Sequence, residues 1–132
     1  MKEELTIKVV IGEVFEAKGS KDVARMINFT GESDCENFKG VILPGGVDTQ
    51  KEIDGEKFLL SARYMLKGTD KAGKECSIFI ENNGEAKIPP AEIITRPVII
   101  TDSEALAYLE DADLEGTIEP WEKGVIIHIF SK

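Results

Sequence analysis

Asp48, Arg63 and Tyr64 are the residues of this sequence whose side chains and placement best suit chemistry on a small molecule. Asp48 follows an apolar run at 41–43 and the turn Pro44-Gly45-Gly46. Because proline donates no ladder hydrogen bond and glycine tolerates unusual backbone angles, a strand ends here and leaves the carboxylate at its end. A carboxylate is a candidate acid or base, and a guanidinium can hold an anionic or carbonyl oxygen.

Arg63 and Tyr64 are neighbours on an expected strand, 58–67, so their side chains point to opposite faces. We assign Arg63, with Ser61 and Met65, to the interior of a barrel, and Tyr64 to the packed outer face. The reason is that an arginine is unusual among packed apolar side chains. Inside a barrel its five donors would need a carboxylate, a carbonyl, water or a ligand.

The same carboxylate and guanidinium also have a purely structural interpretation. Asp48 and Arg63 can form an ion pair, and Asp48 can accept backbone N–H bonds within its turn. Removing one partner of such a buried pair would be costly, whereas a ligand-binding arginine is dispensable for stability. Both interpretations stay open at this point.

Three more residues complete the candidate site, each with a structural alternative. His128, the only histidine, lies in an apolar strand and is a candidate catalytic base beside Asp48, or a histidine satisfied locally. Asn82 orients a ligand, or is a turn residue ahead of Asn83-Gly84. Trp121 forms a pocket wall, or is part of the core. The ligand-binding candidates are therefore Arg63, Ser61, Asn82, Tyr64 and Trp121.

The elements that must position these residues are short β-strands separated by turns. Alternating or β-branched apolar segments recur between turn signals such as Asp54-Gly55 and Pro89-Pro90. One short helix is expected near 103–109, after a capping Asp102 or Ser103. The pattern predicts an all-β fold, a single antiparallel barrel of eight to nine strands in one domain, 1–132. A barrel of about eight strands has room for one small ligand.

Composition excludes several classes of partner. The 132 residues carry 16 basic and 25 acidic side chains, a net charge of −9, which repels nucleic acid and anionic lipid. No apolar run approaches the roughly 20 residues of a membrane span. No phosphate-binding loop is present, and one histidine and two separated cysteines make no zinc motif, so no cofactor or metal is expected.

Location and assembly follow from the termini and the strands. No signal peptide precedes the acidic start of the chain, which favours the cytoplasm, where Cys35 and Cys76 stay reduced. The segments 98–100 and 125–127 are apolar on both faces of their strands. Apolar surface that the monomer leaves uncovered needs a partner, so a homo-oligomer, most simply a dimer, is expected.

The segment 40–48, GVILPGGVD, resembles the core signature of the family called domain of unknown function 3237. The likeness continues through 62–66, through 78–80 with Asn82 and Gly84, and through 95–97. The resemblance implies a small β-barrel of about this length. It implies no reaction, because the family has no established general activity. Thr49 stands where the family often has an aromatic residue, so stacking of a ligand is not implied there.

Two functions fit these observations. The first is a small-molecule-binding barrel, extending to a cofactor-free enzyme on a small organic acid or carbonyl compound. The second is a non-catalytic structural or protein-interaction barrel whose interior is filled by side chains. An open cavity favours the first, and a filled interior favours the second.

Overall fold

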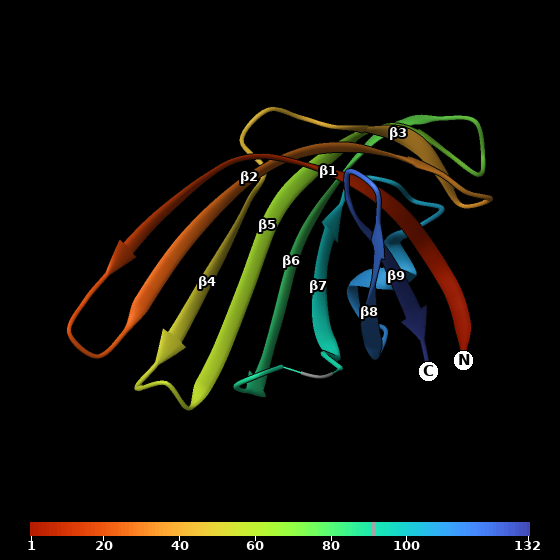
Figure 1. Ribbon diagram of the computed structural model, residues 1–132. Helices are drawn as coiled ribbons and strands as arrows, with labels where there is room; N and C mark the ends of the chain where they lie inside the picture. Colours follow the sequence, from red (N-terminus) through yellow and green to blue (C-terminus); the bar gives the residue numbers. More distant parts are fainter. Residues whose placement is uncertain (91) are drawn as a thin grey trace.

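The computed structural model describes residues 1–90 and 92–132, which form nine β-strands and one turn of 3₁₀ helix (Figure 1). Every strand pairing is antiparallel. The elements are β1 (Lys2–Lys18), β2 (Val23–Asp34), β3 (Phe38–Ile42), β4 (Val47–Ile53), β5 (Lys57–Asp70), β6 (Glu75–Lys87), β7 (Thr95–Thr101), η1 (Ala107–Glu110), β8 (Leu114–Trp121) and β9 (Gly124–Ser131).

The strands close into a ring, which confirms the all-β barrel predicted from the alternating sequence. From β1 the order runs through β9, β8, β7, β6 and β5. Strand β5 then pairs with β3 along one half and with β4 along the other, and both pair with β2, which returns to β1. The Pro-Gly-Gly turn connects β3 to β4, so it stands where the ring passes from one short strand to the other.

Strand β5 shows how the sequence builds the interior. Its alternate residues Phe58, Leu60, Ala62, Tyr64 and Leu66 are all buried, while the residues between them face outward. Burying this set removes a continuous apolar face from water, and each large side chain contributes about 1.5–3 kcal/mol. The period of two therefore fixes which residues share the barrel interior.

Side chains pack one end of the interior solidly. Ile7, Phe38, Leu66, Ile78 and Ile129 are almost fully inaccessible there. The 3₁₀ turn η1 and the residue before it add Leu109 and Leu106 to the same core cluster, so the expected short helix is present and has a packing role. The opposite part of the interior, where β4 begins, is less completely filled.

The turn expected at Asn82-Asn83-Gly84 is wrong. Residues 82–84 do not form a bend but lie within β6, because each is paired to both β5 and β7. Strand β1 is irregular at Gly12, since its register with β2 shifts between Ile11 and Val14.

Neither cysteine is bonded to the other: Cys35 and Cys76 are both free thiols. In the described residues, no helix has the length and apolar character to cross a membrane.

Candidate functional site

The two faces of β5 are the reverse of the assignment made from sequence. Arg63 and Met65 are exposed on the outside, and Ser61 is half-buried on the same outer face. Tyr64 points inward, where its ring meets Phe29 edge to face at a centroid distance of 5.3 Å. The interior of a small barrel is also its hydrophobic core, so the apolar set of a strand enters it and the guanidinium stays in water.

Asp48 lies on the inner face, opposite Ala62 of β5 in the register. Arg63, one residue further along β5, therefore points to the other side of the sheet. This excludes the expected Asp48–Arg63 arrangement in both of its forms, the shared interior site and the structural ion pair. Asp48 instead accepts a hydrogen bond from the side chain of Gln50, with 2.9 Å between Nε2 and Oδ2.

A cavity of about 210 Å³ occupies the interior beside Asp48. Its polar lining residues are Asp48, Gln50 and Asn82, from β4 and β6, and the remaining ones are apolar. The interior is therefore not completely filled by side chains, as the second hypothesis would require. Of the described residues that line this cavity, none is basic.

Four buried side-chain oxygens in the described part of the chain have no hydrogen-bond partner: Asp48 Oδ1, Tyr64 Oη, Asn82 Oδ1 and Thr95 Oγ1. All four belong to inward-facing residues of four neighbouring strands, β4 to β7. An unsatisfied buried polar group costs about 1–3 kcal/mol, so each of these four oxygens calls for a physical explanation.

The register explains why these oxygens gather. Asp48, Ala62 and Asn82 are successive neighbours in one row across β4, β5 and β6. The small Ala62 leaves space between the two polar side chains. In the next row, Thr95 stands between two glycines, Gly84 of β6 and Gly116 of β8.

The glycine of β8 allows the close approach of Thr95. A Cβ at Gly116 would lie 2.3 Å from Thr95 Oγ1 and 3.5 Å from Asn82 Oδ1. Both unsatisfied oxygens are therefore directed at the same place. Thr95 and Gln50 were not among the candidates from sequence. Strand β7 also contains Arg96 and Thr101, so the hydroxyl of Thr95 did not stand out.

Burial controls the charge of these groups. Burial raises the pKa of Asp48 above its ordinary value, and the hydrogen bond from Gln50 opposes this only in part. Burial also raises the pKa of Tyr64, whose hydroxyl keeps its proton. The interior thus combines hydroxyl donors, an amide and a carboxyl group inclined to hold a proton, within apolar walls.

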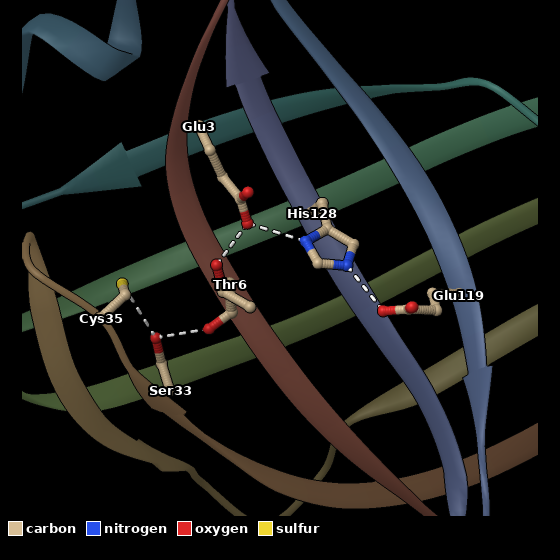
Figure 2. Close-up of polar contacts among 6 residues, drawn as sticks. All are labelled: Glu3, Thr6, Ser33, Cys35, Glu119 and His128. Atoms are coloured by element: carbon tan, nitrogen blue, oxygen red, sulfur yellow. Dashed lines mark hydrogen bonds and ion pairs between the residues drawn. The ribbon is translucent and has the colours of Figure 1, made fainter.

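His128 lies outside the barrel, so its expected place as a base beside Asp48 is wrong. Its Nδ1 is 2.7 Å from Glu3 Oε2 and its Nε2 is 3.0 Å from Glu119 Oε1 (Figure 2). Glu3 also accepts a hydrogen bond from the hydroxyl group of Thr6. The ring therefore links β9 to both of its neighbours, β1 and β8, which is the local structural role given as its alternative.

Stability should depend on the protonation of His128. Burial alone would lower its pKa, but the hydrogen bonds and charges of Glu3 and Glu119 outweigh this and raise it. A pKa raised by folding gives stability that is present below the unfolded value of 6.5 and is lost as pH rises through the folded value.

We expect His128→Gln to lose about 0.5–1 kcal/mol of unfolding free energy near pH 6 and less near pH 8, since the pair is partly exposed. Urea unfolding at both pH values measures this. Thr117→Val, which changes the cross-strand neighbour of His128 on β8, is the control. A loss that grows from pH 6 to pH 8 would contradict the assignment.

Trp121 also lies away from the cavity. Its Nε1 donates to the carbonyl of Val9 at 2.8 Å, and Lys8 Nζ lies 4.3 Å from the centroid of its ring.

Ser61 donates to Asn83 Oδ1 at 2.6 Å on the outer face, where it lines a shallow groove with Arg63. Of the seven candidates, Asp48, Asn82 and Tyr64 come together in the interior, and Arg63, Ser61, His128 and Trp121 do not.

Within residues 1–90 and 92–132, no group of three or more histidine, cysteine, aspartate or glutamate side chains is arranged to hold a metal ion.

The chain is similar to proteins of several bacteria. It is 34% identical over 102 residues to a UPF0311 protein of Clostridium acetobutylicum; the match covers 76% of this chain and 61% of that protein, so the chain spans about three fifths of that relative's length. A solved structure of a protein of unknown function from Clostridium acetobutylicum superposes with a TM-score of 0.81 at 22% identity, covering 98% of this chain and 96% of the other.

A β-barrel-like protein from Acinetobacter baumannii gives a TM-score of 0.73 at 19% identity, over 98% of this chain and 94% of that one. At these identities the two structures establish the fold alone. The family model described as protein of unknown function (DUF3237) matches residues 1–96, the part that contains the Pro-Gly-Gly turn, Asp48 and Asn82. The chain belongs to this family of proteins of unknown function, DUF3237.

Proposed function

We propose that this protein binds a small, uncharged organic molecule inside its barrel. The observation that carries the proposal is an interior cavity lined by Asp48 and Asn82, each of which has a buried side-chain oxygen without a hydrogen-bond partner in the described part of the chain. Stability alone would select apolar residues at these positions. Polar groups retained in an apolar cavity without partners are the expected apo state of a site whose partners arrive with a ligand.

The cavity sets the size and polarity of the ligand. A dry cavity of about 150 Å³ admits benzene. The 210 Å³ measured here therefore suits one ring with one or two polar substituents. The apolar walls bind the ring, and the carboxyl group of Asp48 with the amides of Gln50 and Asn82 binds oxygens that both donate and accept.

The charge of the site selects neutral ligands. Asp48 is the titratable group that lines the cavity, and no basic lining residue among those described would neutralise an anion. Of the two ligand classes expected from sequence, a carbonyl compound is therefore favoured over an organic acid.

Catalysis on a bound carbonyl compound is a second candidate function, and the raised pKa of Asp48 favours it. A carboxyl group whose pKa lies closer to neutrality is better suited to give a proton to, and take it back from, a bound oxygen. Binding alone leaves the ligand unchanged, so recovery of altered ligand from the mixture separates the two functions.

A titration followed by amide NMR tests the binding proposal. Cyclohexanone and phenol should bind, with affinities on the order of millimolar, and shift the amide signals of β4, β5 and β6, which line the cavity. Toluene, which has no oxygen, should bind more weakly, and benzoate should not bind because its carboxylate would face Asp48 in an apolar space.

Two results would contradict the proposal. One is the absence of shifts with every probe, which would favour the non-catalytic barrel. The other is a preference for benzoate, which would place binding at the outer groove that Arg63 and Ser61 line. Thr49→Val, on the outer face of β4, is the control and should bind cyclohexanone as the wild type does.

A further inference from the structure

The outer face of β5, β6 and β7 carries several apolar side chains that are exposed to water. Met65, Val98 and Ile100 expose 41%, 52% and 60% of their surface. In the register, Met65 lies opposite Phe79 and Phe79 opposite Ile100. Three apolar residues are therefore neighbours across β5, β6 and β7, which are adjacent strands (Figure 1). Contiguous exposed apolar residues of this kind mark an interaction surface.

The adjacent row combines apolar and charged side chains. Arg63 of β5 lies opposite Glu81 of β6, with Val47 on one side of them and Val98 on the other. Arg63 forms no ion pair within the described part of the chain, and Glu81 accepts a hydrogen bond only from Asn83 there. A cation and an anion thus stand beside each other, each available to a partner.

We infer that this outer face binds a second copy of the same chain about a two-fold axis that runs along the strands between β5 and β6. Such an axis places each β5 residue of one subunit over a β6 residue of the other subunit. That β6 residue is the one that lies opposite it in the register within a single chain. The pattern is therefore self-complementary, as a symmetric dimer requires.

The contacts that follow are matched in character. Arg63 meets Glu81 of the partner subunit, and the same pair occurs a second time by symmetry. Met65 meets the partner's Phe79, and Val47 meets the partner's Val98. A two-fold axis perpendicular to the strands would instead place apolar residues on charged ones, so the charge pattern selects one orientation.

A second copy is favoured over other partners by this complementarity. An acidic partner would repel Glu81, and a basic partner would repel Arg63. A second copy of the chain offers an opposite charge to each of these two residues. Phe15 and Met26 are exposed apolar residues that lie opposite each other on the β1–β2 hairpin, and they serve as a reference surface. The dimer expected from residues 98–100 is thereby given a specific interface.

Sedimentation equilibrium on the full chain tests the inference. The wild type should have twice the 14.5 kDa chain mass. Arg63→Glu and Glu81→Arg should each raise the dissociation constant about tenfold or more, because like charges then oppose across the interface. The double variant with both changes restores opposite charges and should recover most of the affinity. Ile100→Glu should weaken the dimer strongly.

Phe15→Glu is the matched control, since Phe15 is 54% exposed outside the surface, and it should leave the dimer intact. A wild type that stays monomeric into the millimolar range would overturn the inference. So would a dimer that Arg63→Glu and Ile100→Glu leave unchanged, or a double variant that is no tighter than the single ones. Circular dichroism of each variant establishes that it is folded. Because these side chains point away from the cavity, ligand binding inside the barrel is tested separately.

Discussion

We expect Asp48→Leu to raise the free energy of unfolding of the unliganded protein by about 1–3 kcal/mol at neutral pH. The same substitution should abolish cyclohexanone binding. The wild-type carboxyl group has one buried oxygen without a partner, in a cavity with room for a larger apolar side chain. Leucine removes that penalty and also removes the group that the ligand would contact. Gln50 loses its acceptor but is partly exposed and can turn to water.

The pH dependence of this gain has a definite sign. Folding raises the pKa of Asp48, so the native state holds its proton more tightly than the unfolded chain, whose value is 3.8. The stability of the wild type is therefore reduced as pH rises from 3.8 through the folded pKa. The advantage of Asp48→Leu should be smallest below about pH 4 and reach its full size at neutral pH.

Urea unfolding across this range, with NMR titration of cyclohexanone at neutral pH, measures both effects. Thr49→Val is the control for a substitution on the outward face of the same strand, and it should change neither. A loss of stability in Asp48→Leu would mean that the carboxyl group supports the fold. Unchanged binding would mean that the ligand lies elsewhere.

The fold could be predicted from the sequence because strand periodicity and turn residues are local signals. The alternation of β5 separates its two sets of residues correctly, with Arg63 and Ser61 in one and Tyr64 in the other. Alternation does not say which set faces inward. The assignment failed because a small barrel's interior was treated as a polar space, whereas it is mainly the hydrophobic core.

Long-range pairing explains the remaining differences. Asn82-Asn83-Gly84 has turn-forming residues, yet pairing with β5 on one side and β7 on the other holds it in a strand. That pairing turns Asn82 inward beside Asp48, so the two predicted site residues meet. His128 alternates with the buried Ile127 and Ile129, and this local pattern alone indicates that its ring points outward.

The closure of the ring depends on a glycine pair that only the structure reveals. Gly68 of β5 lies directly opposite Gly40 of β3. A Cβ at Gly68 would stand 2.1 Å from the carbonyl oxygen of Lys39 and 2.5 Å from the Cα of Gly40. These are backbone atoms, so β3 itself would have to move away, and it carries Phe38 and Ile42 into the core.

We expect Gly68→Ala to lower the free energy of unfolding by about 3 kcal/mol or more, because no side-chain rotation relieves a backbone collision. Gly73→Ala is the matched control: its Cβ meets nothing within 4 Å, although its φ of +81° should cost about 1 kcal/mol. Urea unfolding of both variants isolates the steric effect as their difference. If Gly68→Ala were no less stable than Gly73→Ala, β3 would be free to shift outward, and the ring would not depend on the close approach of β3 to β5.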